Sequence, residues 1–568
     1  MMSAPVRYNV FIITGTILVC SSCSSNMEDT AQPNILFISI DDMADWVTAL
    51  DGHPNVKTPV IDELISRGIN FTNAHCTSPI CGPSRAAILT GLRPESSGVY
   101  HNVGPDGTGL GTYDLYVPEA VAFPRYLREH GYHAMGAGKI NHSYTKVVEE
   151  NWDEYGPDVG IVGSPFTHEE LLVEKMDPTI CINRDNLNVT LPINRMSNID
   201  RPNNLWSTFD WGPLDITDDD MPDGRIANWG VEQLGRDFDK PFFLGIGIYK
   251  PHLPWYAPRE YFDLYDPDEI ELPPHREGDL DDLLQTARDY ALLAWTAGKH
   301  ETVLEHDQWL PAVHAYLATI SFVDAQVGKV LKALDNSPYA ENTLIILFSD
   351  HGFHLGEKEH WGKHTPWQRC TRVPFVIVPP KNNLPDNFIP GTLVDAPVNL
   401  MDIYPTLVEM CGLPEKTGLD GKSLYPLIEN PGMEWDEATV TTVGRGTHSI
   451  RTKQWRYIHY YDGTQELYDT YVDPNEWYNL AYDPDYADIK EYLSKFIIDD
   501  PNFRQFVRWG NWKAAIPYEG DMKLFDIYGP FGISEQNDVF AENQDVARNV
   551  LDYLEENNIT YKNVLISE

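Results

Sequence analysis

Three short apolar runs in this 568-residue chain each end in charged or imidazole side chains. Residues 35–40 lead into Asp41-Asp42, residues 242–248 into Lys250-Pro251-His252, and residues 344–348 into Ser349-Asp350-His351. Runs this short and apolar are typical of strands that are buried on both faces of a parallel sheet. Because ligands of open α/β sheets bind beyond the carboxyl ends of the strands, the sequence predicts a polar site at that edge.

The segments between these runs predict helices. Apolar residues recur three and four positions apart at 60–67, 119–130 and 314–334, and such an alternation of strands and helices predicts an α/β domain, which we expect at 32–434. Beyond residue 435 the pattern of predicted secondary structure changes. Residues 447–461 and 465–471 flank Asp462-Gly463, which is typical of a β-hairpin, and residues 544–556 have helical spacing. We therefore expect a smaller C-terminal α+β domain with an antiparallel sheet at 435–568.

The first 23 residues are predicted to be a targeting segment. Arg7 supplies a positive flank, and residues 10–19 form an apolar run that is too short to span a bilayer. The run ends in Cys20-Ser21-Ser22-Cys23, which resembles a bacterial lipoprotein cleavage box with Cys23 as the lipidated residue, although Cys20 replaces the usual leucine. Ordinary signal cleavage is the alternative. In both cases we expect export to the periplasm or cell surface of a bacterium, with membrane anchoring if the lipid is added.

The net charge of the chain limits the classes of partner that it can bind. The formal net charge is −43, which argues against nucleic acid as a partner and means that an anionic substrate needs a local basic pocket. A solubility role for the acidic residues is the alternative.

Five of the seven cysteines lie beyond the leader. This odd number points to one unpaired reactive thiol, and the spacing leaves the pairing of the other four open.

The most specific motif is Cys81-Gly82-Pro83-Ser84-Arg85, which runs into a predicted helix closed by Gly91. A Cys-x-Pro-Ser-Arg string is expected by chance in roughly one chain in a thousand of this length. The motif resembles the signature of the type I sulfatase family, in which Cys-x-Pro-Ser-Arg is followed by a segment that ends in Thr-Gly. Here that pair is Thr90-Gly91. The resemblance implies that a maturation enzyme oxidises Cys81 to formylglycine, whose hydrated form attacks the sulfur of a sulfate ester. An inert buried cysteine before a helix is the alternative.

Adjacent carboxylates at two predicted strand ends can hold a metal ion. A hard dication requires several oxygen ligands close together, although an Asp-Asp pair alone also occurs in helix caps and solvated turns. The sulfatase resemblance implies a calcium ion bound by Asp41, Asp42, Asp350 and the oxygen made on Cys81. His351 stands where many sulfatases have asparagine, which implies a nitrogen ligand there.

Six basic side chains accompany these motifs. Each taken singly is more often solvated or internally paired, but in so acidic a chain a group of them beside the strand ends favours a bound anion. The resemblance assigns the formylglycine diol to Arg85 and Lys139, the sulfate oxygens to Lys250 and Lys363, the base on the diol to His142, and the acid to the leaving alcohol to His252.

The whole set of motifs, from about residue 34 to 480, is similar to iduronate-2-sulfatase-like bacterial polysaccharide sulfatases. This implies an alkaline-phosphatase-like mixed sheet sandwiched by helices. It also implies a carbohydrate sulfatase for an ulvan- or glycosaminoglycan-like polymer. Because a chain with a net charge of −43 repels a long polyanion, we expect it to act on the ends of short oligosaccharides. Trp255, Tyr256 and Trp367 are candidates to stack on the sugar, with core packing as the alternative. The competing functions are a phosphonate monoester or phosphodiester hydrolase of the same superfold, and an inactive glycan-binding lipoprotein.

Overall fold

The structure is a computed structural model. It describes residues 32–556 except 105–111, 143–146, 158, 160–162, 167–179, 185–186, 197–208, 295, 436–437, 519–521 and 529–537. From Pro33 on, the chain forms one compact unit. The predicted leader at 1–23 lies outside the described residues, so export and lipidation stay predictions. Among the described helices, none has both the length and the apolar character that crossing a membrane requires.

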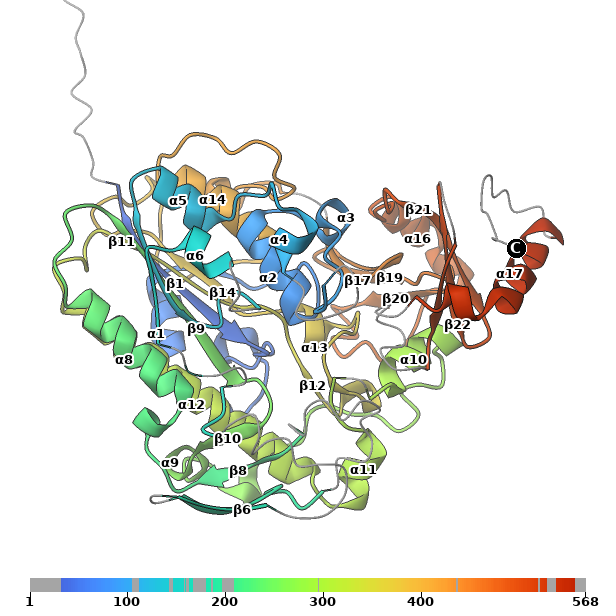
Figure 1. Cartoon of the computed structure of the whole chain (residues 1–568), viewed down its shortest axis with the longest axis horizontal. Helices are drawn as coiled ribbons and strands as arrows, with labels where there is room; N and C mark the ends of the chain where they lie inside the picture. The colour runs from blue at the N-terminus through green and yellow to red at the C-terminus, as the bar shows by residue number, and fades with distance from the viewer. Residues whose placement is uncertain are drawn as a thin grey trace, which may run out of the picture. The chain divides into compact units, whose positions relative to one another are not determined.

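An eight-stranded mixed sheet forms the centre of this unit (Figure 1). The strand order is β15-β2-β14-β11-β1-β9-β4-β5. The strands from β11 to β5 are parallel to one another, whereas β14 runs antiparallel to both β11 and β2. The bounds of the strands are β1 Asn34–Asp41, β2 Ile69–Phe71, β4 His133–Gly138, β5 Glu154–Tyr155, β9 Phe242–Pro251, β11 Thr343–Ser349, β14 Phe375–Val378 and β15 Thr392–Val394.

The three apolar runs of the sequence are the neighbouring strands β11, β1 and β9. Every residue of these three strands is buried, as expected for strands covered on both faces. Ile40 of β1 lies opposite Ser349 of β11 and Ile248 of β9, so the three strands end at the same level. The polar residues that follow them therefore meet at one edge, as predicted.

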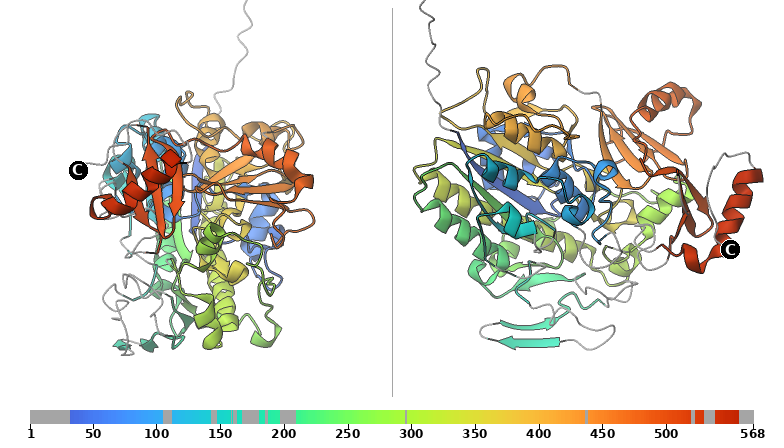
Figure 2. Two further views of the ribbon diagram at one scale, coloured as in Figure 1. Left: turned by 90° about the vertical axis from the view of Figure 1, so that its right-hand side faces the viewer. Right: turned by 45° about the horizontal axis from the view of Figure 1, so that its top comes forward.

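Helices cover both faces of the sheet (Figures 1 and 2). Successive strand residues point to opposite faces, so Ile38 and Leu347 enter one apolar core, and Phe37 and Ile346 enter another. The first core is completed by α1 (Pro59–Arg67), α8 (Pro222–Leu234) and α12 (Trp309–Asp335). The second is completed by α2 (Cys81–Thr90), α5 (Phe123–Glu129) and α14 (Ile403–Met410). The predicted fold class is confirmed. The helix expected at 119–130 begins only at Phe123, because Pro124 favours the first turn of a helix.

Two antiparallel sheets follow in the C-terminal part of the chain (Figure 2). The hairpin at Asp462-Gly463 joins β19 to β20, as predicted. The stretch 447–461 is two strands and not one, because the chain turns at Thr452, whose Oγ1 accepts a hydrogen bond from Trp455 N at 2.8 Å. The domain boundary at residue 434 stays a prediction. The bounds are β17 Thr439–Gly444, β18 Thr447–Arg451, β19 Trp455–His459, β20 Gln465–Asp469, β21 Phe503–Trp509, β22 Trp512–Pro517, β23 Lys523–Asp526 and α17 Gln544–Glu556.

Candidate active site

Cys81 is the first residue of α2 and lies at the carboxyl edge of the sheet. All ten residues of α2 are buried. Gly91 ends the helix with a φ of +69°, a conformation that glycine adopts without strain. The next backbone amide, Gly82 N, donates to Asn102 Oδ1 at 2.7 Å. Because the N-terminus of a helix carries a partial positive charge, a negative group on Cys81 is favoured at this position.

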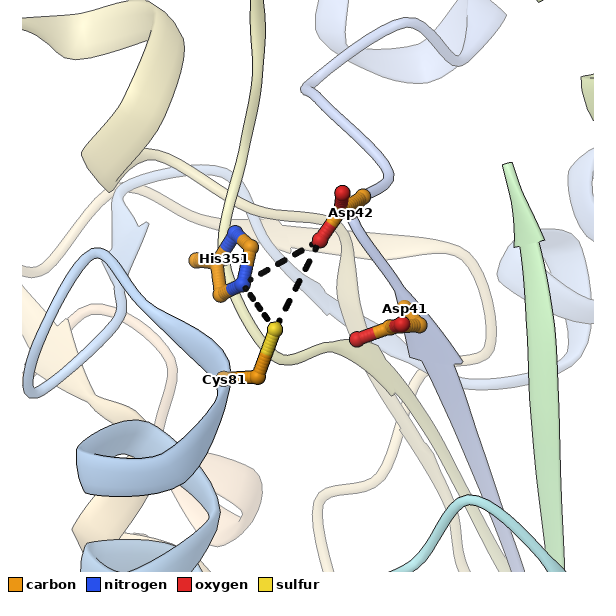
Figure 3. Close-up of side chains that lie close together, drawn as sticks. All are labelled: Asp41, Asp42, Cys81 and His351. Carbon is orange, nitrogen blue, oxygen red and sulfur yellow. Dashed lines mark hydrogen bonds and ion pairs between the residues drawn. The ribbon is translucent and has the colours of Figure 1, made fainter. Parts of the chain in front are cut away.

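Cys81 and three other buried side chains bring their polar atoms close together (Figure 3). Asp41, Asp42, Cys81 and His351 each offer a ligand atom, and these atoms all lie within 4.8 Å of one another. His351 Nε2 is 3.3 Å from both Cys81 Sγ and Asp42 Oδ1. Cys81 Sγ is 3.8 Å from the same Asp42 oxygen. The strand ends and the start of α2 thus meet in one cluster, which we call the acid cluster.

Asp350 lies beside the acid cluster. Its Oδ1 accepts hydrogen bonds from Asp42 N at 3.1 Å and from His351 N at 2.9 Å. Its Oδ2 is 3.7 Å from His351 Nε2 and 2.8 Å from Arg85 Nε. Burial raises the pKa of Asp350 to about 7, although the Arg85 guanidinium acts to lower it. Asp350 therefore orients two residues of the acid cluster and keeps one oxygen close to it.

The residues present fit a divalent cation. Three buried carboxylates and one imidazole supply the oxygen and nitrogen donors that such an ion takes. Asp42 Oδ2 is buried and accepts no hydrogen bond from the part of the chain that the structure describes. A buried polar atom left without a partner is costly, and coordination of a cation would satisfy it.

Arg85 joins the ends of β1, β11 and β4. Its guanidinium contacts Asp41 Oδ1 at 3.1 Å and Asp350 Oδ2 at 2.8 Å, and it also donates to the carbonyl of Lys139. The side chain is only 2% exposed. Burial lowers the pKa of Arg85, but Asp350 and Asp41 outweigh this effect and raise it above its usual range. Arg85 is therefore a permanent buried cation between two carboxylates.

Two lysines bring positive charge to the sulfur. Lys363 Nζ is 3.0 Å from Cys81 Sγ and 2.6 Å from Asp42 Oδ1. Lys139 Nζ is 3.6 Å from Cys81 Sγ and 2.5 Å from Asp41 Oδ2. Burial and the Asp41 carboxylate raise the pKa of the Cys81 thiol, but Lys139, Lys363 and His351 outweigh them and hold it well below its usual range. The surroundings thus favour a negative group at this position.

The other three basic residues lie around this centre in different ways. His252 Nε2 is 3.9 Å from Asp42 Oδ2, and burial lowers the pKa of its ring to about 3. Burial also lowers the pKa of His142, against the opposing effect of a hydrogen bond with Cys81. Lys250 Nζ donates to the carbonyls of His252 at 2.8 Å and Pro254 at 2.5 Å. The contacts that the structure gives the Lys250 ammonium are therefore with its own turn.

The aromatic residues proposed to stack on a sugar are interior residues. Trp255, Tyr256 and Trp367 are each 1% exposed or less. The Trp255 ring packs 5.5 Å from Trp211 and 5.3 Å from Tyr316. Side chains buried to this extent present no free face to a sugar, so the structure favours the alternative, core packing, over sugar stacking for all three.

Several contacts of the site were not found from the sequence. Ser84 Oγ donates to the carbonyl of Asp350 at 2.6 Å, and Tyr316 and Ser349 bind the backbone beside Asp42. Ser84 lies inside the cysteine motif, and Ser349 directly follows the third apolar run, so the motif and the end of the run could have indicated these two residues. Tyr316 lies in an apolar helix with no distinguishing pattern.

Four of the five cysteines beyond the leader are free buried thiols, namely Cys76, Cys81, Cys370 and Cys411. The side chain of the fifth, Cys181, lies outside the described residues.

Comparison with known proteins identifies the family. The sulfatase family model matches residues 33–413, and the model for the C-terminal region of N-sulphoglucosamine sulphohydrolase matches residues 356–501. The chain belongs to the sulfatase family. It is accordingly a sulfuric ester hydrolase, as the motifs around Cys81 predicted.

Named relatives of this sulfatase come from bacteria and animals. A sulfatase of Formosa agariphila is 36% identical over 485 residues, which cover 84% of this chain and 89% of the relative. An ulvan-active sulfatase of the same organism is 28% identical and covers 86% and 85%. The iduronate 2-sulfatase of Mus musculus is 28% identical and covers 70% and 72%. The predicted similarity to iduronate-2-sulfatase-like and polysaccharide sulfatases is confirmed.

The fold of this sulfatase is also found in a phosphonate monoester hydrolase. The crystal structure of the enzyme from Agrobacterium radiobacter superposes with a TM-score of 0.61 over 82% of this chain and 94% of that one. The two sequences are 23% identical, so the likeness shows a common fold and does not extend to the reaction.

The position of Arg85 between two carboxylates generates a prediction. Arg85→Met leaves Asp41 and Asp350 buried without their shared cation and should lower the free energy of unfolding by about 3–5 kcal/mol. Arg67→Met is the matched control, because Arg67 forms a similar two-point pair with Asp335 at the surface. That control should cost at most about 1 kcal/mol. Urea denaturation measures both, and equal losses would contradict the structural role given to Arg85.

Proposed function

We propose that this sulfatase removes sulfate esters from a carbohydrate and that its nucleophile is a formylglycine made from Cys81. The observation that carries the proposal is the position of Cys81 Sγ, which has Lys363 Nζ at 3.0 Å and His351 Nε2 at 3.3 Å. The Cys-x-Pro-Ser-Arg motif and membership of the sulfatase family support it. A hydrated formylglycine places a hydroxyl oxygen where the sulfur lies, and the neighbouring cations favour its negative charge.

The cationic residues then have separate roles. Arg85 and Lys139 orient the hydroxyls of the modified Cys81 side chain, and Lys363 binds a sulfate oxygen. His252 donates a proton to the leaving alcohol when the diol oxygen bonds to sulfur. His142 accepts a proton from the diol, so that the second hydroxyl re-forms the aldehyde and expels sulfate. Burial lowers the pKa of His252, and a bound sulfate ester raises it again because it is an anion. The role of Lys250 as a sulfate ligand requires that its ammonium leave the carbonyls of His252 and Pro254.

We propose calcium as the metal of the acid cluster. The residues that would hold it are Asp41, Asp42, Asp350, His351 and the oxygen on the modified Cys81. When bound, the ion polarises the sulfate group and stabilises negative charge on the nucleophile. The donor set is rich in carboxylates, and Asp42 Oδ2 accepts no hydrogen bond from the described residues; both observations support a hard cation.

The substrate that we propose is the end of a sulfated oligosaccharide of the ulvan or glycosaminoglycan type. The ulvan-active and iduronate sulfatase relatives support this class. The charge of the chain supports action on chain ends: a net charge of −43 repels a polyanion, whereas the buried cations attract a single sulfate.

The second candidate function is a phosphonate or phosphodiester hydrolase of the same fold. Its only support is the structural likeness to the phosphonate monoester hydrolase of Agrobacterium radiobacter. An inactive glycan-binding protein is less well supported, because the cysteine, acids and cations are all present.

We further propose that the protein is exported and lipid-anchored, and that it meets its maturation enzyme on the way. The apolar run at 10–19 and Cys23 support the anchor.

Replacement of the cysteine tests the nucleophile. Cys81→Ala should abolish sulfate release and leave the protein folded, because the change removes a small buried group without disturbing the sheet. Cys411→Ala is the matched control, since Cys411 is also a buried free thiol but directly follows α14 and packs in the second apolar core. It should keep wild-type activity. Release of sulfate from an aryl sulfate is the measurement, and substantial activity of Cys81→Ala would disprove the mechanism.

Metal content tests the proposed calcium. Asp42→Asn keeps the shape of the residue and its tolerance of positive φ but removes the charge, so the purified variant should lose both bound calcium and activity. Asp324→Asn changes a buried carboxylate that caps α1 through Val60 N and Ile61 N, and this control should keep its calcium. Elemental analysis measures the metal. Full activity of the wild type after prolonged chelation would exclude an essential cation.

The substrate proposal is tested with matched ligands. Sulfate release should be faster from short sulfated oligosaccharides than from the intact polymers at moderate salt, for algal and animal sources alike. Faster release from the interior of intact polymer would overturn action at chain ends. Activity on aryl sulfates alone would overturn the carbohydrate assignment. Efficient hydrolysis of phenyl phosphonate, with none of the sulfates hydrolysed, would favour the second candidate.

A further inference from the structure

Asp42 has a backbone conformation that is uncommon for residues other than glycine. Its φ is +62°, in the left-handed region that glycine adopts freely and that, among other residues, Asp and Asn tolerate best. Asp41, one residue earlier, still belongs to β1. In a continuing strand the two successive side chains would point to opposite faces, whereas here both carboxylates reach the acid cluster. Asp42 Oδ1 faces Cys81 and His351 there (Figure 3). A strained conformation of this kind persists only where the surroundings hold it.

Three successive backbone amides at this turn donate to side chains. Asp42 N donates to Asp350 Oδ1 at 3.1 Å. Met43 N donates to Ser349 Oγ at 2.9 Å, and Ala44 N donates to Tyr316 OH at 2.9 Å. The turn is thus held by side chains from the end of β11 and from α12, and not by a regular backbone ladder.

Each of the two hydroxyls also donates a hydrogen bond back to the site. Tyr316 OH donates to the carbonyl of Asp42 at 2.8 Å. Ser349 Oγ donates to the carbonyl of His351 at 2.9 Å. Tyr316 therefore fixes the peptide groups on both sides of Met43, and Ser349 links the turn to the imidazole ligand of the acid cluster.

The Tyr316 ring is itself held firmly. It is fully buried in α12 and meets Trp46 at 5.1 Å and Trp255 at 5.3 Å between ring centroids. Trp255 Nε1 donates to the carbonyl of Pro251 at 2.7 Å, within the turn that carries His252. Tyr316 therefore binds the Asp42 turn through its hydroxyl, and its ring packs on Trp255, which binds the His252 turn.

We infer that Tyr316 and Ser349 are positioning residues that hold Asp42 in its left-handed conformation and thereby set the affinity of the acid cluster for a divalent cation. The inference rests on the calcium site of the proposed function. Neither hydroxyl is assigned as a ligand. Each acts through the backbone and fixes the direction of the Asp42 carboxylate before an ion binds. Less conformational entropy is then lost when the ion binds.

Calcium titration of the chelated, full-length protein tests the inference. Tyr316→Phe keeps the ring and removes the hydroxyl, and it should weaken calcium binding by about tenfold; Ser349→Ala should act in the same direction. Tyr265→Phe is the matched control, because Tyr265 is buried and its hydroxyl binds Ser321 Oγ at 2.6 Å and the carbonyl of Leu317 at 3.3 Å, both in α12 and neither in the Asp42 turn. It should leave the calcium affinity unchanged even if the melting temperature falls.

Hydrogen exchange of the backbone amides of residues 42–44 supplies a second readout that needs no metal. Tyr316→Phe and Ser349→Ala should each speed exchange in this segment, and Tyr265→Phe should not. Unchanged exchange and unchanged calcium affinity in both site variants would overturn the inference. If the wild type binds no calcium, the proposed metal fails and with it the effect on affinity. Exchange then decides separately whether the two hydroxyls hold the turn.

Discussion

The structure depends on the burial of three carboxylates at one edge of a parallel sheet. Asp41, Asp42 and Asp350 are each 1% exposed or less. Charges removed from water to this extent are tolerated only when counter-charges are close. Arg85 contacts the first and third carboxylates, Lys139 the first and Lys363 the second. The same pairing that makes the fold possible therefore places the cations around Cys81.

This requirement links the fold to the chemistry of the site. The level ends of β11, β1 and β9 put the acids together, and α2 brings Cys81 and Arg85 to them from a single helix. A group that becomes negative at Cys81 meets positive charge already in place. Preorganised charge of this kind stabilises a transition state without reorganisation during the reaction. The chain as a whole is strongly acidic, so the cations of the site supply a local attraction for an anion.

Much of this could be predicted from the sequence, and the parts that failed share a cause. Short apolar runs ending in polar residues identify buried strands, and strand direction alone then brings Asp41 and Asp350 to one edge. Sequence position does not say where a long or flexible side chain points. The role of Lys250 at the sulfate stays a prediction, because its ammonium bonds to its own turn in this structure. Trp255 follows the same motif and lies in the core. Tyr316 was not found at all, because one hydroxyl in an apolar helix carries no periodic signal.

We propose that residue 81 is a formylglycine, and not a cysteine, in the working enzyme. The most direct measurement is the mass of the peptide that contains residue 81, from protein produced with a formylglycine-generating enzyme and shown to release sulfate. The account predicts that this peptide has the mass of the aldehyde or its hydrate, and that it reacts with a hydrazide probe in proportion to activity. Full activity in protein whose residue 81 is entirely an unmodified thiol would contradict the account.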